Sequence, residues 1–230
     1  MTPLFAITPP SGAVDPDCID RWHEAGARGR IALWLREPGA QPWQLIGARL
    51  RAIIARARVH GVPILLGIDA SAIDEAARLV IDERFAGVVL RGDPDRAALL
   101  RARDRLRSAA WLGRSVHDPD AADHDLCDFS VLGPIFAPHT GKPFASTPLG
   151  LDALGRAPAD AFVVALGGID GTRASACLAA GARGLAGIRS FFGPAQAVAQ
   201  DVAAFCTALQ TATHAQATPD GRARGRGPTT

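Results

Sequence analysis

The chain has 230 residues, of which 48% are hydrophobic and 21% are charged, and its formal net charge is +2. This composition argues against a disordered or fibrous body, and so small a charge does not indicate polyanion binding, so we expect no nucleic-acid partner. No apolar run approaches the roughly 20 residues of a membrane span, and the start lacks a signal-peptide pattern, so we expect no membrane contact and a cytoplasmic protein.

Short apolar runs alternate with longer amphipathic segments along the chain, which is typical of βα units and a parallel sheet. The predicted strands span residues 4–8, 31–36, 62–67, 85–90, 109–113, 128–132, 162–166 and 184–188. The predicted helices span residues 18–25, 45–57, 72–81, 95–106, 151–154, 172–180 and 195–209, with a short segment at 118–124. Eight such repeats predict an α/β protein with a single domain, a (β/α)8 TIM barrel over residues 1–210.

The composition changes after residue 210 to Thr, Ala, Gly, Pro and Arg, with no apolar periodicity. Residues 211–230 are therefore predicted to form a disordered C-terminal tail. The four cysteines form no Cys-x-x-Cys pair, which argues against a zinc or redox motif.

In a parallel barrel the chemistry belongs at the carboxyl ends of the strands. Gly167 and Gly168 follow the predicted seventh strand, and Ile188, Arg189 and Ser190 follow the eighth. Glycines let backbone N–H groups approach an anion closely, a following helix adds the positive end of its dipole, and Arg189 adds charge. A tight turn is the alternative for the glycine pair alone. Because both strand ends carry the pattern, we predict that they bind the phosphate of a small-molecule ligand.

The loop after the sixth predicted strand is long and contains His139, Thr140 and Lys142. It is interpreted as a mobile lid, in which Lys142 neutralises a phosphate and Thr140 donates a hydrogen bond. The alternative is a plain surface loop rich in Pro and Gly.

Two other strand ends carry candidate side chains. Arg36 is interpreted as an anion ligand, with a rim ion pair to Glu37 as the alternative. Ser115 is expected to point its hydroxyl group toward the barrel mouth. His117 is interpreted as a structural histidine, because nothing in the sequence pairs it with an orienting carboxylate.

Several of these segments together resemble the thiamine phosphate synthase/TenI family, whose members are (β/α)8 barrels. The matching segments occur in the family's order and span nearly the whole barrel: Leu35-Arg36-Glu37, Gly113-Arg114-Ser115-Val116-His117, Gly133-Pro134-Ile135-Phe136, Thr140-Gly141-Lys142, Pro148-Leu149-Gly150-Leu151, Ala165-Leu166-Gly167-Gly168-Ile169 and Ala180-Gly181-Ala182. The resemblance implies a role in thiamine biosynthesis, with a thiazole phosphate on Gly168 and Ile188 to Ser190.

The resemblance leaves two activities open. One is a TenI-type tautomerisation of a thiazole carboxylate phosphate, which needs no cofactor. Its binding residues would be Ser115, Lys142, Gly168 and Ser190, with His139 moving the proton. The other is a Mg²⁺-dependent synthase that joins hydroxymethylpyrimidine diphosphate to thiazole phosphate. It would use Arg36, Asp69, Asp93, Ser115, Thr140 and Lys142, with Asp69 and Asp93 as the metal ligands.

Departures from the family pattern favour the first activity. Trp34 and Pro38 stand where synthases carry Gln and Lys, so two diphosphate ligands are absent. Pro134 stands where the TenI tautomerase has its proton-transfer histidine, which is why His139 is the candidate. A third hypothesis is a barrel that binds the phosphorylated ligand without turnover. The sequence leaves open whether the chain forms a homo-oligomer.

Overall fold

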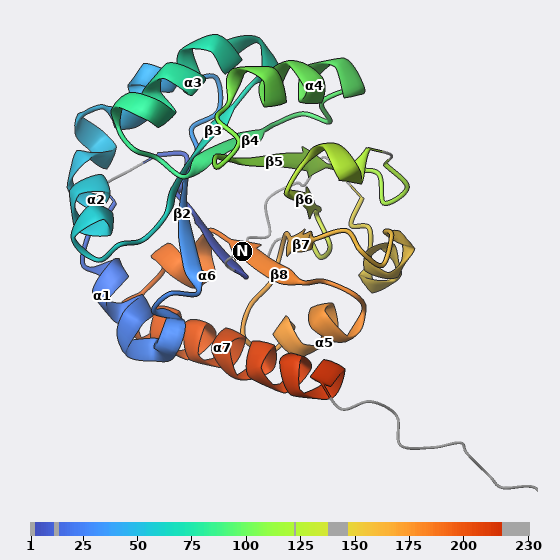
Figure 1. Cartoon of the computed structure of the whole chain (residues 1–230). Coiled ribbons are helices and arrows are strands. Elements are labelled where there is room, and N and C mark those ends of the chain that lie inside the picture. The colour runs from blue at the N-terminus through green and yellow to red at the C-terminus, as the bar shows by residue number, and fades with distance from the viewer. Residues whose placement is uncertain (1–2, 12–13, 122, 138–146, 218–230) are drawn as a thin grey trace, which may run out of the picture.

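The computed structural model describes residues 3–11, 14–121, 123–137 and 147–217, with side chains described as far as His214. Eight parallel strands form a closed barrel in which each strand pairs with its neighbours in chain order and β8 pairs with β1 (Figure 1). The strands are β1 (Leu4–Ile7), β2 (Ile31–Leu35), β3 (Ile64–Ile68), β4 (Gly87–Leu90), β5 (Trp111–Val116), β6 (Phe129–Leu132), β7 (Val163–Leu166) and β8 (Gly184–Gly187). The predicted single-domain (β/α)8 barrel is confirmed.

The barrel interior is filled by a compact apolar cluster of inward-facing side chains. The rings of Phe5 and Phe129 stack at its centre with their centroids 4.8 Å apart, and both side chains are fully buried. Gly113 on β5 leaves the space for this stack, because a Cβ atom there would lie 2.3 Å from the Phe129 ring. Burial of each such ring contributes about 1.5–3 kcal/mol to folding, so the interior is a packed core and the open space lies above it.

The helices surround the barrel as an outer layer (Figure 1). They are α1 (Cys18–Trp22), α2 (Ala48–Val59), α3 (Ile73–Asp82), α4 (Arg96–Arg105), α5 (Ala174–Ala179), α6 (Arg189–Phe192) and α7 (Ala195–Ala217). The predicted start of the fourth helix is confirmed, because Asp95 caps α4 by accepting a hydrogen bond of 2.7 Å from the Ala98 N–H. Within the described residues, none of these helices has the length and apolarity that a membrane crossing needs.

The flank of the barrel at β5 and β6 carries a short 3-10 turn, His124–Leu126, in place of a long helix. Arg114 on β5 is 2% exposed and points into this layer, where its Nε donates to the Ser130 hydroxyl at 3.0 Å. The Ser130 hydroxyl also lies 3.2 Å from the His124 ring nitrogen Nδ1. A buried guanidinium therefore shares its hydroxyl partner with a half-buried imidazole.

This arrangement predicts a loss of stability at acidic pH. Burial lowers the pKa of His124 from 6.5, and the neighbouring Arg114 charge lowers it further. In the unfolded chain the imidazole takes up a proton near pH 6.5, whereas the folded protein resists that proton, so the free energy of unfolding falls as pH falls through 6.5. We expect urea unfolding at pH 7.5 and pH 5.5 to show this drop, and His124→Gln to reduce it. An equal drop in the variant would contradict the assignment.

Helix α7 extends beyond its predicted end. It continues from 209 to Ala217, so the first part of the segment predicted as a disordered tail is helical. The sequence there alternates Ala and Thr, and the Thr211 and Thr213 hydroxyl groups donate to carbonyl oxygens four residues earlier. Those bonds satisfy groups that would otherwise compete with the helix. Residues 218–230 of the predicted tail lie outside the described residues.

Candidate functional site

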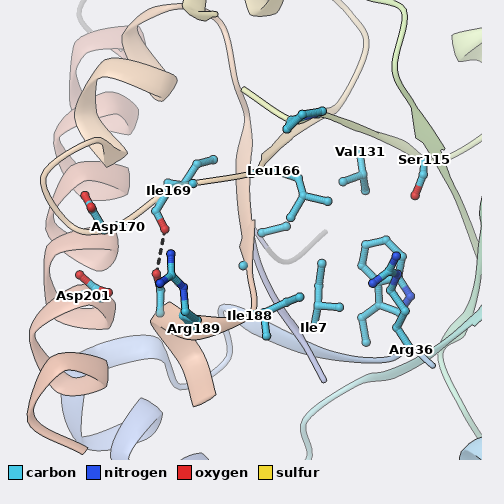
Figure 2. Close-up of a pocket in the computed structure, with 18 of the residues that line it drawn as sticks. Ile7, Arg36, Ser115, Val131, Leu166, Ile169, Asp170, Ile188, Arg189 and Asp201 are labelled. Atoms are coloured by element: carbon cyan, nitrogen blue, oxygen red, sulfur yellow. Dashed lines mark hydrogen bonds between the residues drawn. The ribbon is translucent and has the colours of Figure 1, made fainter. Parts of the chain in front are cut away.

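A cavity of about 730 Å³ lies at the carboxyl ends of the strands. Its walls are apolar, with Ile7, Val131, Leu166 and Ile188 among the lining residues. Polar groups gather at two opposite sides: Figure 2 shows Ile169 and Arg189 at one side and Arg36 and Ser115 at the other. Such a cavity fits a small ligand that has an apolar middle and polar ends.

The side at β7 exposes bare backbone. Gly167 and Gly168 adopt φ values of +102° and +61°, the left-handed region that favours glycine. A Cβ atom on Gly168 would lie 2.6 Å from the Ala137 carbonyl oxygen, so a side chain does not fit. Arg173 donates to the Gly168 carbonyl oxygen at 2.5 Å. At Gly167 and Gly168 the cavity is therefore lined by backbone without side chains.

The side at β8 is a short helix, α6, that begins where the strand ends. The N–H groups of Arg189 and Ser190 are in its first turn and have no partner within the helix. The helix is fixed from behind by Trp22, whose Nε1 donates to the Phe191 carbonyl oxygen at 2.9 Å. A short helix after β8 beside the end of β7 is where barrels of this type bind phosphate.

Ser190 is used differently from the prediction. Its side chain is buried, and its hydroxyl donates to the Ile169 carbonyl oxygen at 2.8 Å, the bond drawn in Figure 2. The hydroxyl proton therefore ties the end of β7 to the start of α6, and the N–H is what Ser190 offers to a ligand. Sequence reasoning missed this bond because it joins residues 21 positions apart.

Two carboxylates that were not predicted line the same side of the cavity, Asp170 and Asp201. Asp201 accepts from the Gly171 N–H at 2.8 Å, and Asp170 accepts from the Thr172 N–H at 3.0 Å. Both hold backbone of the turn that follows β7. They lie at the outer limit of the cavity beside Arg189 (Figure 2).

Arg36 lies at the opposite side of the cavity. The Thr8 hydroxyl fixes its backbone, accepting from the Arg36 N–H at 2.9 Å and donating to its carbonyl oxygen at 3.0 Å. Its alternative partner Glu37 pairs instead with Arg49 at 3.2 Å. Burial lowers the pKa of the Arg36 guanidinium, and the nearby Arg91 charge lowers it further. Within the described residues the guanidinium has no hydrogen-bond partner, so an anionic group of a ligand would stabilise it.

Ser115 and His117 also line this side of the cavity. The interpretation of His117 as a histidine without a carboxylate partner is wrong. Asp93 accepts from the His117 N–H through Oδ1 and lies 2.7 Å from the ring Nδ1 through Oδ2. Asp93 has a left-handed backbone with φ of +53°. No sequence pattern indicates this pair, because the two residues follow different strands, 24 positions apart.

Residues 4–191 match the model of the TMP-TENI family, described as thiamine monophosphate synthase. The chain belongs to this family. It is 34% identical over 165 residues to the thiamine-phosphate synthase of Chloroflexus aurantiacus, in a match that covers 69% of this chain and 70% of that protein. Membership supports a role in thiamine biosynthesis.

Solved structures agree on the fold. The thiamine phosphate pyrophosphorylase from Pyrococcus furiosus matches with a TM-score of 0.68 at 18% identity, covering 91% of this chain and 96% of that one. A 3-hexulose-6-phosphate synthase matches with a TM-score of 0.63 at 17% identity, covering 92% of this chain and 99% of that one. At such identities the similarity shows the barrel fold alone.

A family member that works as a synthase needs carboxylates for Mg²⁺, and the predicted pair does not fit. Asp69 forms an ion pair with Arg91 at 3.0 Å, and both carboxylate oxygens of Asp93 are engaged by His117. Among the described residues no three His, Cys, Asp or Glu side chains are grouped as metal ligands. Mg²⁺ prefers several oxygen ligands in near-octahedral geometry, and this donor set does not supply them.

Trp34, which the family resemblance sets at the position of a diphosphate-binding Gln, lines the cavity. It is 1% exposed, and within the described residues its Nε1 has no hydrogen-bond partner. Gly67 makes room for the indole, because a Cβ atom there would lie 2.3 Å from Nε1. The indole therefore gives the cavity an apolar wall at the end of β2.

The three candidate residues of the predicted lid, His139, Thr140 and Lys142, lie outside the described residues. Their assignments as proton-transfer, hydroxyl and phosphate-neutralising residues stay predictions. The other predicted residues Arg36, Ser115, Gly167, Gly168, Ile188, Arg189 and Ser190 all line the one cavity.

Proposed function

We propose that this family member binds a thiazole phosphate with its phosphate at the ends of β7 and β8, and catalyses a TenI-type tautomerisation without a metal. The observation that carries the proposal is the division of the cavity into two unlike sides. Gly168 and the first turn of α6 offer N–H groups to an anion. The opposite side carries the Trp34 indole, and the carboxylates that a metal diphosphate would need there, Asp69 and Asp93, pair with the lining residues Arg91 and His117.

The two arginines of the cavity suit a ligand with one anionic group at each end, while Asp170 and Asp201 on the phosphate side accept hydrogen bonds from backbone N–H groups of the turn after β7. Arg189, the first residue of α6, is exposed, and Arg36 lies across the cavity without a partner among the described residues. A thiazole carboxylate phosphate has its phosphate and its carboxylate on opposite sides of the ring. Its apolar ring would lie between Ile7, Leu166 and Ile188, where burial favours binding.

A second candidate function is that of a thiamine phosphate synthase whose diphosphate-binding residues differ from those of the family pattern. The 34% identity to the Chloroflexus aurantiacus protein of that name favours it. In that case Arg36 would bind the diphosphate and the lid residue Lys142 would assist. The present donors for Mg²⁺ argue against this candidate, because Asp69 and Asp93 are engaged elsewhere.

One pair of assays separates the candidates. The purified chain is incubated with the non-aromatic thiazole carboxylate phosphate in EDTA, and aromatic product is followed by chromatography. A parallel sample receives thiazole phosphate, hydroxymethylpyrimidine diphosphate and Mg²⁺, and pyrophosphate is measured. We expect aromatic product in the first sample and no pyrophosphate in the second. Pyrophosphate release would assign the synthase, and binding of thiazole phosphate with neither product would assign a non-catalytic binder.

A further inference from the structure

We propose that His117, held by Asp93, is the residue that transfers the proton in this cavity. The inference rests on the proposed function, since it names the group that performs its chemical step. It does not depend on the lid, where the predicted proton carrier His139 lies outside the described residues. It also gives the proposed reaction a titratable group, which the end of β6 does not supply because it carries Pro134.

One carboxylate holds His117 at two points. Asp93 Oδ1 accepts from the His117 backbone N–H at 2.7 Å, and Oδ2 lies 2.7 Å from the ring nitrogen Nδ1. Asp93 is itself anchored, because its N–H donates to the Ser115 carbonyl oxygen at 3.2 Å. The side chains of His117 and Asp93 are 57% and 50% exposed, so a single contact would leave the ring free to rotate. The double contact orients both the backbone and the ring.

The contact to Asp93 also selects the tautomer of the ring. A carboxylate accepts hydrogen bonds, so in the neutral ring the contact favours the tautomer with the proton on Nδ1 and the lone pair on Nε2. Among the residues that the structure describes, nothing hydrogen-bonds to Nε2. An imidazole with Nδ1–H on a carboxylate and a free Nε2 is arranged to act as a general base.

The position of the ring suits the proposed ligand. His117 follows β5 and lines the cavity with Ser115. The proposed phosphate site lies across the cavity, at Gly168 and Arg189. Arg189 and Ser115 lie at opposite sides of the cavity (Figure 2), so a ligand held by its phosphate at β7 and β8 would extend its ring toward Ser115 and the end of β5. The reacting ring of the ligand would then lie between the proposed phosphate site and His117.

The step balances in atoms and electrons. Nε2 takes a proton from a carbon of the non-aromatic ring, and the electron pair of that C–H bond moves into the ring π system. The imidazolium, stabilised by the Asp93 carboxylate, then gives a proton to the carbon at the far end of the shifted double bond. The ligand leaves as its aromatic isomer, and the imidazole ends with the protons with which it began.

The test compares His117→Gln, Asp93→Asn and the control His214→Gln, which changes an exposed histidine at the end of α7. Asn tolerates the left-handed backbone of residue 93, so this variant removes the charge and keeps the turn. Tautomerisation is measured in single-turnover experiments, and the dissociation constant for the aromatic thiazole phosphate by calorimetry. The ring tautomer of His117 is read from ¹⁵N chemical shifts.

We expect His117→Gln to lower the rate at least about 100-fold and Asp93→Asn about tenfold, with ligand affinity within about threefold of the parent. The ¹⁵N shifts should show a protonated Nδ1 in the parent and a mixture of tautomers in Asp93→Asn. A rate in His117→Gln as high as in the His214→Gln control, or a protonated Nε2 in the parent, would overturn the inference while leaving the proposed function intact. Absence of tautomerisation in the parent would instead overturn the proposed function.

Discussion

Replacing Gly168 with Asp is expected to lower the affinity for thiazole phosphate by more than about 100-fold, a loss of roughly 3 kcal/mol in binding free energy. Three effects act together. A Cβ atom at this position would lie 2.6 Å from the Ala137 carbonyl oxygen and 2.9 Å from Phe136. The backbone φ of +61° costs a residue with a side chain about 1–2 kcal/mol, and the new carboxylate repels a phosphate. Calorimetric titration with thiazole phosphate measures the change.

The matched control is Gly61→Asp. Gly61 has nearly the same backbone, with φ of +64°, and a Cβ atom there would meet nothing within 4 Å. It precedes β3 and therefore lies at the amino end of the barrel, away from the cavity. The control should carry a similar backbone cost and unchanged affinity. Equal affinity in Gly168→Asp and the parent, with both proteins folded by circular dichroism, would refute the phosphate site at β7.

Replacing Trp22 with Ala is expected to lower the free energy of unfolding by about 3–5 kcal/mol. The Trp22 side chain is fully buried, and its ring makes edge contacts with Phe191 and Phe192 at centroid distances of 5.9 and 5.4 Å. Its Nε1 is also the donor that holds the Phe191 carbonyl oxygen in α6. Because α6 supplies the N–H groups of the phosphate site, affinity for thiazole phosphate should fall in the same variant. Urea unfolding and calorimetry measure the two effects.

Trp43→Ala is the control for this change. Trp43 is 57% exposed, so its removal should alter the free energy of unfolding by no more than about 0.5 kcal/mol and leave affinity unchanged. If Trp22→Ala changed the free energy of unfolding and the affinity as little as Trp43→Ala does, Trp22 of α1 would not be the residue that holds α6 in place.

The barrel could be predicted because its signal is periodic and local. Short apolar runs alternate with amphipathic helices along the chain. The runs are apolar because a parallel strand is buried on both faces, and the helices are amphipathic because one side covers the sheet. The ends of strands and helices were harder to predict. Strand β5 continues to Val116, beyond its predicted end at 113, and helix α7 continues to Ala217, beyond its predicted end at 209. In both places polar side chains interrupt the apolar pattern. Pairing with β6 continues β5, and α7 continues with threonine hydroxyl groups bonded to carbonyl oxygens of the preceding turn.

The site could be predicted as a set of strand ends and not as a set of contacts. Gly168, Arg189 and Arg36 lie around one cavity, as the barrel rule requires. The bonds that assign their roles join distant positions: Ser190 to Ile169, Asp69 to Arg91 and Asp93 to His117. Such pairings depend on the register of neighbouring strands and on side-chain direction, which a single sequence does not contain.

The most direct test of the phosphate site is a crystal structure of the protein with thiazole phosphate. We expect the phosphate at the ends of β7 and β8, with its oxygens about 2.7–3.2 Å from the N–H groups of Gly168, Arg189 and Ser190, and the ring directed toward β5. A phosphate bound to Arg36 on the opposite side, or a ligand outside the cavity, would contradict this placement.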